Sequence, residues 1–372
     1  TSLATWVSPV VTLAGDRADY SDIGWQGHER SRAMAREALE LARTAGAVFS
    51  GSDWDADGEV DGVLLLHAGP GLENDPQGLI VPSQYFLAEP VVQRGTMARS
   101  YAVAAERSTV GVVVHETLHL LGLEDRYDRQ LDGSAETGPR GGLGRFSVMA
   151  SGWLGSGLGI DPALPDAYSR LQLGWVRTGK DLAFDSVIRL RQDGPAGPEY
   201  FLAERRSPDR FGWVDGALPA DQVLIYHVDE SLADGEISAP GWPARHLRVE
   251  LVEADGGREI ARGESDGEGA DMFPAQGGTQ AFSDVTFPGS WTWDGADTGV
   301  SVTVSTTGGD VTLVDQGQGR WGDLRLEVAE IGGTVVITPL VRFAPEDGLP
   351  DEVALELEVL DDAWGTFVAG TV

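Results

Sequence analysis

Residues 115–125 read HETLHLLGLED and carry metal-binding and acid–base side chains within one short stretch. On a helix, His115 and His119 lie one turn apart on the same face, where two imidazoles can share one Zn²⁺. Glu116 directly follows the first histidine, so its carboxylate leans over the same metal. The stretch therefore predicts a zinc-binding helix with a general base beside the metal.

The chain after this helix can supply a third ligand. Gly122 comes where the helix should end, and a glycine there can adopt the left-handed backbone conformation that reverses the chain. The reversal can bring Asp125 back toward the histidines, and Asp128 is a second carboxylate nearby. Two histidines and one carboxylate leave a fourth position for water, as a catalytic zinc site requires.

The flanks of the motif favour a buried helix. Residues 110–114 read VGVVV, and Leu118, Leu120 and Leu121 make the segment apolar nearly all round. Buried His and Glu side chains need partners, and a metal supplies one. Ser108 or Thr109 is the expected N-cap.

The extended pattern HExxHxxGxxD resembles the metzincin clan of zinc peptidases, and several further motifs narrow the resemblance to the immune inhibitor A (M6) family of secreted bacterial metallopeptidases. These motifs are GLEDRYD (122–128), DGEVD (57–61), LHAGPG (66–71), SVMASG (147–152), LGW (173–175), YFLAERR (200–206) and LIYHVDE (224–230). The order and spacing of these motifs, over most of residues 50–310, carry the resemblance.

The resemblance implies roles for individual residues. Its spacing favours Asp125 over Asp128 as the third zinc ligand, and Asp128 would then support the ligands from outside or have a structural role. Met149 would form the methionine turn that packs beneath the metal. Ser151 stands where several metzincins have a tyrosine that assists the zinc. Residues 79–88 read as a strand, and Pro82 places it at a sheet edge; in metzincins such an edge strand binds substrate by strand addition.

Composition limits the classes of partner. The formal charge is −32, with 59 acidic and 27 basic residues, and Lys180 is the only lysine. Such a surface repels nucleic acid and anionic membranes. The chain has no cysteine, which excludes disulfides and thiolate chemistry and leaves metals as cross-links. No stretch is apolar enough to span a membrane and no signal-like segment opens the chain. We expect a secreted monomer, and the start at Thr1 suggests a processed or trimmed product.

Residues 53–61 are a second metal candidate. Asp53, Asp55 and Asp57 stand at positions 1, 3 and 5 of an EF-hand-like loop, whose remaining features are Gly58 at position 6, Glu59 at position 7 and Asp61 at position 9. Leu64 occupies the twelfth position, where an EF-hand has a bidentate glutamate. An acidic turn before a strand is the alternative reading. We favour structural Ca²⁺, because carboxylates this close repel one another without a cation.

The remaining pattern predicts an α+β protein, a metzincin-like zinc peptidase domain followed by an antiparallel β-sandwich. The expected divisions are 1–178 (catalytic), 179–315 (β-sandwich) and 316–372 (additional strands or a partial β-module). Residues 29–46 read as an amphipathic helix, Val63–Leu66 as a buried strand, and residues 165–173 as the closing helix of the catalytic domain. Alternating segments beyond residue 179 predict strands at 187–190, 200–204, 223–228, 247–252, 300–304, 311–314, 324–328, 335–341 and 353–359.

We expect a zinc-dependent endopeptidase that acts on proteins or peptides. One alternative is a calcium-dependent adhesin or carbohydrate-binding protein with a peptidase-like domain, which the intact His115, Glu116 and His119 disfavour. Another is a thermolysin-like enzyme with a glutamate ligand on a later helix, but no convincing ExxxD helix follows and Met149 would be unexplained. His67, His227 and His246 have no motif context and are expected to be structural.

Overall fold

A computed structural model describes the backbone over most of the chain. The described residues are 7–23, 28–73, 75, 79–128, 141–179, 182–190, 198–208, 210–233, 246–307, 310–315, 324–331 and 334–341. The predicted strand at 353–359 lies outside them. None of the helices they contain has the length and apolar character needed to cross a membrane.

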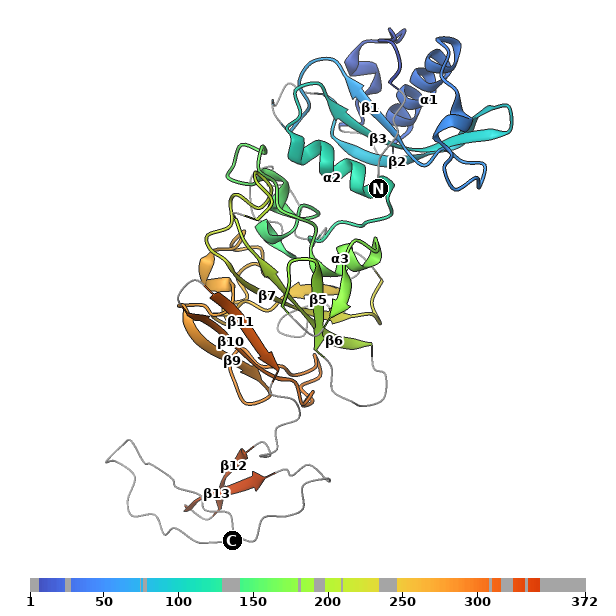
Figure 1. Cartoon of the computed structure of the whole chain (residues 1–372). Coiled ribbons are helices and arrows are strands. Elements are labelled where there is room, and N and C mark those ends of the chain that lie inside the picture. The colour runs from blue at the N-terminus through green and yellow to red at the C-terminus, as the bar shows by residue number, and fades with distance from the viewer. Residues whose placement is uncertain are drawn as a thin grey trace.

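Three α-helices and several separate sheets make up the described structure, in agreement with the predicted mixture of α and β elements (Figure 1). The helices are α1 (Glu29–Thr44), α2 (Val110–Leu120) and α3 (Ala167–Gln172). The strands of the N-terminal part are β1 (Val63–His67), β2 (Ser83–Gln93) and β3 (Thr96–Ala105). The later strands are β4 (Arg177–Gly179), β5 (Ser186–Leu190), β6 (Glu199–Arg206), β7 (Gln222–Asp229), β8 (Val249–Leu251), β9 (Gly278–Ser283), β10 (Ser301–Thr307), β11 (Asp310–Asp315), β12 (Leu324–Ile331) and β13 (Thr334–Val341).

The N-terminal sheet has the order β1-β3-β2, with β1 parallel and β2 antiparallel to the central strand β3. Helix α1 lies on one face of this sheet and α2 on the other (Figure 1). Alternate residues of β3 point to the α1 side, where Tyr101 and Val103 pack against Met34 and Leu39. β3 runs directly into α2, so the sheet sets the position of the helix that carries the HExxH motif.

The expectation of a buried strand at Val63–Leu66 is only half right. The strand forms, but β1 is an edge strand and its residues alternate in burial. Leu64 is 37% and Leu66 61% exposed, because only the face that carries Val63 and Leu65 packs on the α1 core. An apolar run without polar residues hides this alternation from the sequence.

The strand predicted at 79–88 begins at Ser83, just after Pro82, and extends to Gln93. It lies at the edge of its sheet, as Pro82 indicated. Pairing with β3 is interrupted between Phe86 and Val91, where the register shifts. The N-terminal half of β2 is thereby separated from the hairpin that leads into β3.

Beyond α3, a five-stranded sheet (β4-β5-β6-β7-β8) and a three-stranded sheet (β11-β10-β9) follow. The two sheets share a core in which Phe201 and Ile225 of the larger sheet lie with Phe282 and Val302 of the smaller one. β4 and β9 lie outside the strands expected from the alternation pattern. β12 and β13 form a separate antiparallel pair. The β-sandwich description remains a prediction.

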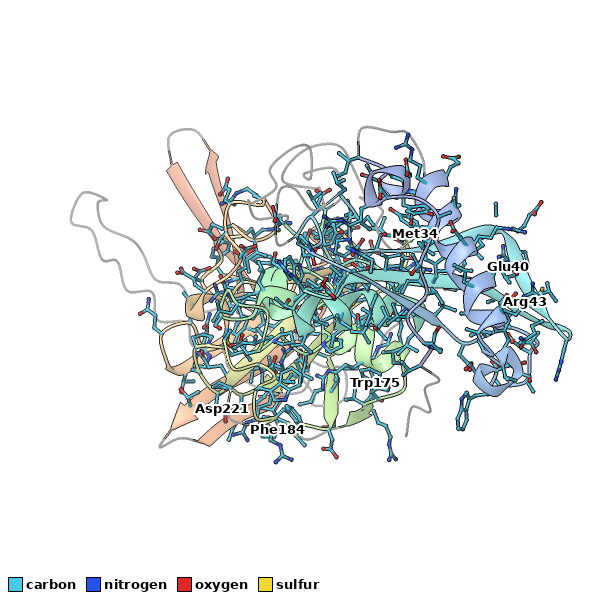
Figure 2. The ribbon with its side chains drawn as sticks, turned by 90° about the horizontal axis from the view of Figure 1, so that it is seen from above. Met34, Glu40, Arg43, Trp175, Phe184 and Asp221 are labelled. Carbon is cyan, nitrogen blue, oxygen red and sulfur yellow. The ribbon has the colours of Figure 1, made fainter. Side chains whose placement is uncertain are left out.

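The other face of the five-stranded sheet packs against the segment that follows α2. Leu143, Phe146 and Tyr168 share one core with Leu202 and Tyr226. Figure 2 shows Glu40 and Arg43 on α1, on the opposite side of the view from Phe184 and Asp221. The predicted divisions at 178/179 and 315/316 remain predictions, but packing is continuous across the first of them.

Candidate metal centre

Helix α2 begins after Thr109, one of the two expected caps, and ends at Leu120. Its sequence is apolar apart from the motif, and His115 and Glu116 are both buried. Gly111 lets the chain pack closely behind the helix, because a Cβ there would lie 1.9 Å from the carbonyl oxygen of Trp153. The helix is therefore held between β3 and the segment around Trp153.

The chain reverses at Gly122 as the sequence indicated. This glycine has φ +87°, in the left-handed region, and its N–H donates to the carbonyl of His119 at 3.0 Å. The N–H of Leu123 donates to the carbonyl of Leu118 at 3.2 Å, which closes the end of the helix. Leu123 packs into the apolar cluster beneath the helix. The reversal brings Asp125 back to the two histidines.

Three ligand atoms meet at one point. Oδ1 of Asp125 lies 3.3 Å from Nε2 of His115 and 3.3 Å from Nε2 of His119. The two Nε2 atoms are 3.2 Å apart. Tetrahedral ligands at about 2.0–2.1 Å from zinc lie about 3.3 Å from one another. The spacing and the donor set therefore fit a zinc ion. Asp128 is buried but does not belong to this group of ligand atoms.

Each imidazole is oriented through its other nitrogen. Nδ1 of His115 donates to the carbonyl of Val148 at 2.8 Å, and Nδ1 of His119 donates to the carbonyl of Leu123 at 2.7 Å. A proton on Nδ1 leaves Nε2 with its lone pair free for a metal. The carbonyls of Val148 and Leu123 thus select the tautomer whose Nε2 could bind a metal.

The charge state of the site also suits a metal. Burial alone would raise the pKa of Asp125, but hydrogen bonds and charges from His115 and His119 hold it well below the usual range. Burial raises the pKa of Glu116 to about 7, while the two histidines lower it. Oε2 of Glu116 is buried and has no hydrogen-bond partner among the described residues. This oxygen is available to a water molecule or a substrate.

Met149 lies beneath the motif helix, as the methionine turn implied. It is fully buried and packs with Leu118, Leu123 and Val148. Ser151, at the position of the tyrosine in several metzincins, donates its hydroxyl to Asp266 at 2.8 Å. It is therefore directed toward the segment between β8 and β9.

The acidic loop before β1 brings three of its five expected calcium ligands together. Carboxylate oxygens of Asp53, Asp55 and Asp57 lie within 4.8 Å of one another, and Oδ1 of Asp53 is buried. Asp61 instead accepts the N–H of Trp54 at 2.9 Å. Glu59, also expected to ligate, lies outside the group of three.

This loop is tied to the central strand of the N-terminal sheet. The N–H of Val60 donates to the carbonyl of Met97 at 2.8 Å, and the N–H of Met97 donates to the carbonyl of Gly58 at 2.8 Å. Met97 belongs to β3, which leads to helix α2 with the HExxH motif. Loosening the loop should therefore disturb β3 as well as the edge strand β1.

The other histidines have partners that do not form a metal group. His67 contacts the carbonyl of Ala68 through Nδ1. Nε2 of His227 lies 3.0 Å from Glu199, and Nε2 of His246 lies 3.0 Å from Asp229. Both of these rings stack on Trp293, with centroids 4.6 and 4.1 Å away.

A pocket of about 210 Å³ lies beside the start of β2. Its lining residues are Tyr20, Asp22, Ile23, His28, Ser31, Ile80, Val81, Ser83 and Tyr85. His28 stacks on Tyr85 with ring centroids 3.7 Å apart. Burial raises the pKa of Tyr85, and the charges of Asp22 and Glu116 raise it further. The pocket thus lies within electrostatic reach of the buried carboxylate of the motif.

Sequence reasoning missed a group of buried polar residues around the site. Asp166 and Ser147 are fully buried and hydrogen-bonded at 2.9 Å, and Nε of Arg126 lies 3.8 Å from Oδ2 of Asp166. Glu73 accepts a hydrogen bond from Ser108 before α2, and its charge raises the pKa of Glu116. Asp166 precedes a helix and could be recognised as an N-cap, but its contacts with distant residues have no local signal.

Comparison with known proteins agrees with this picture. Residues 87–176, which contain α2 and Met149, match the family model described as the immune inhibitor A peptidase M6 catalytic domain. The chain is 28% identical over 191 residues to "Immune inhibitor A" of Bacillus thuringiensis subsp. alesti. The match covers 42% of this chain and 27% of the Bacillus protein, so it spans about a quarter of that relative. The resemblance to M6 peptidases stated from the motifs is confirmed.

Proposed function

We propose that this M6-family chain is a zinc-dependent endopeptidase that hydrolyses peptide bonds in proteins. The observation that carries the proposal is the convergence of His115, His119 and Asp125 beside Glu116, inside the segment that matches the M6 catalytic domain. A calcium-dependent adhesin or carbohydrate-binding protein has no need of this convergence.

His115, His119 and Asp125 would hold the zinc through Nε2, Nε2 and Oδ1. Bound zinc polarises a carbonyl and lowers the pKa of a bound water to about 7. The three side chains supply two neutral nitrogens and one carboxylate, which leaves one net positive charge on the centre for a developing oxyanion. Val148 and Leu123 keep the imidazoles in the tautomer that this binding requires.

Glu116 would act as the general base and then as the general acid. Its buried Oε2 is free to accept the proton of the attacking water and to pass that proton to the leaving amine. Its raised pKa favours proton exchange near neutral pH, although a divalent cation next to it would lower that pKa. Met149 packs below the ligands and does not take part in proton transfer.

The substrate would lie extended along β2 and pair with its outer edge. Arg32 and Arg36 of α1 already donate to the carbonyls of Phe86 and Glu89, at 2.9 and 3.0 Å. Pairing is therefore expected along the first residues of β2, beside the pocket that contains Tyr85. Main-chain pairing tolerates many sequences, so specificity should be broad and set by side-chain pockets.

We also propose that Asp53, Asp55 and Asp57 hold a structural Ca²⁺. Their oxygens are the hard ligands that calcium prefers, and their close approach is costly without a cation. We also propose that the protein is secreted and monomeric, as expected from its sequence.

Casein hydrolysis tests the proposed activity. The purified chain should degrade casein, lose this activity with 1,10-phenanthroline, and regain it when zinc is restored. Hydrolysis that is unaffected by the chelator would contradict a zinc mechanism. Absence of hydrolysis in a chain that holds one zinc would favour the binding-protein alternative.

A further inference from the structure

We propose that Asp166 is a positioning residue of the zinc site, and that it acts on His115 and on Asp125 through two separate hydrogen-bonded routes. The proposal rests on the zinc site described above. Asp166 follows Met149 in the chain, is fully buried, and does not belong to the group of three candidate ligands. Its hydrogen bonds connect it to the candidate ligands through other residues.

The first route runs through the methionine turn to His115. Ser147 donates its hydroxyl to Oδ2 of Asp166 at 2.9 Å, and its Oγ accepts the N–H groups of Met149 at 3.2 Å and of Asp166 at 3.3 Å. The bond from Met149 holds the peptide group that joins Val148 to Met149. The carbonyl of Val148 is the one that accepts Nδ1 of His115.

A backbone hydrogen bond also holds Val148 through its N–H. The N–H of Val148 donates to the carbonyl of Leu164 at 3.2 Å. Leu164 in turn donates its N–H to Asp215 at 2.8 Å, and Asp215 pairs with the buried Arg206 of β6. The segment that ends in Asp166 is thus anchored to the five-stranded sheet.

The second route runs through α3 to Asp125. Ser169 donates its hydroxyl to Oδ2 of Asp166 at 2.7 Å and accepts Nε of Arg126 at 3.2 Å. Nε of Arg126 also lies 3.8 Å from Oδ2 of Asp166. Arg126 directly follows the ligand Asp125, and its N–H donates to the carbonyl of Met149 at 2.8 Å. Both routes therefore depend on one oxygen atom, Oδ2 of Asp166.

The other oxygen of Asp166 has a different task. Oδ1 accepts the N–H of Ser169 at 3.0 Å and caps the N-terminus of α3. Asparagine caps helices about as well as aspartate. The substitution Asp166→Asn can therefore keep the cap, but its amide nitrogen cannot accept the hydroxyls of Ser147 and Ser169. The variant separates a positioning role from a capping role.

The test measures zinc affinity by chelator competition and the visible spectrum of the Co²⁺-loaded chain. We expect Asp166→Asn to weaken zinc binding by about 10–100-fold, the usual effect of losing an outer hydrogen-bond partner of a metal ligand. We also expect its Co²⁺ bands to shift, because the angles between His115, His119 and Asp125 change. Thermal melting without metal gives the general cost to folding.

Asp284→Asn is the matched control. Asp284 is a buried carboxylate after β9 whose Oδ1 accepts Ser290 Oγ at 2.9 Å and Thr298 N at 2.9 Å, and whose Oδ2 accepts Gly299 N at 2.6 Å. Its loss should destabilise the fold to a similar degree and leave both zinc affinity and the Co²⁺ spectrum unchanged. A weakening of equal size in this control would mean that the effect of Asp166→Asn is only structural.

Wild-type zinc affinity and an unchanged Co²⁺ spectrum in Asp166→Asn would overturn the proposal. If that variant does not fold, Ser147→Ala removes the first route with a smaller change, and wild-type affinity in Ser147→Ala overturns the proposal in the same way. A wild-type chain that binds no zinc would instead overturn the proposed function itself, so the two failures are distinct.

Discussion

Nδ1 of His119 lies 2.7 Å from the carbonyl oxygen of Leu123, the first residue after the reversal at Gly122. One turn of backbone therefore both ends the helix and orients a candidate metal ligand that the helix carries. The same reversal delivers Asp125 to the imidazoles. The conformation of a glycine and the geometry of the metal site are physically linked.

This link predicts the effect of Gly122→Ala. A left-handed conformation costs a residue with a Cβ about 1–2 kcal/mol, and space itself is no obstacle because nothing lies within 4 Å of the added atom. Melting should reveal this loss, and zinc affinity should fall because Leu123 and Asp125 shift. Gly46→Ala is the control, since Gly46 has φ +104° and the same open surroundings after α1. An equal loss of zinc affinity in both variants would refute the link.

The choice between Asp125 and Asp128 gives a second prediction. Asp125→Ala should weaken zinc binding by at least about 10–100-fold, the range found even for partners outside the ligand set. Asp128→Ala removes a buried carboxylate that lies outside the group of ligand atoms, so its main effect should be on stability. Chelator competition on both variants decides the matter. Normal zinc content in Asp125→Ala together with loss in Asp128→Ala would reverse the assignment.

The calcium site predicts a difference in melting between two proteins. A ligand that binds only the folded state stabilises it by about 2.7 kcal/mol at one hundred times its dissociation constant. Added Ca²⁺ should raise the melting temperature of the wild type and much less that of an Asp55→Ala, Asp57→Ala double variant. The charge-matched control is Glu40→Ala with Glu264→Ala, two exposed carboxylates that pair with arginines. The same calcium-induced rise in all three proteins would exclude this loop.

The stability of the fold should depend on pH through Asp271, a residue that is 3% exposed. Burial raises its pKa to about 6, although the N–H of Glu268 opposes this. A carboxyl whose pKa is higher in the folded state stabilises the fold below its unfolded pKa of 3.8, and this contribution is lost as pH rises through 6. Asp271→Asn should thus melt at a higher temperature than the wild type at pH 8 in EDTA and show no such gain at pH 4. The expected gain in the free energy of unfolding at pH 8 is at most about 3 kcal/mol. A gain of the same size at both pH values would rule out this titration.

Most of the structure around the HExxH motif could be predicted from local sequence patterns. The spacing of His115, His119 and Gly122 is determined by helix geometry and by the φ freedom of glycine, so both the helix and its reversal could be predicted. The helix at Glu29–Thr44 followed from its apolar periodicity in the same way. Such features depend on neighbours within a few residues.

Features that depend on distant partners could not be predicted. The exposed face of β1 depends on which strands lie beside it, and an apolar run carries no sign of an edge position. The role inferred for Asp166 depends on Ser147 and Arg126, which lie 19 and 40 residues away along the chain. β9 has the sequence GTQAFS, which alternates too weakly to be recognised as a strand.

The most direct test of the zinc endopeptidase is Glu116→Gln, with zinc content and casein hydrolysis measured on the same preparation. The amide keeps the shape of the side chain but cannot take a proton from water. We predict one zinc per chain, as in the wild type, and hydrolysis at least about 100-fold slower, the usual contribution of a general base. Full zinc content with casein hydrolysis near the wild-type rate would contradict the account.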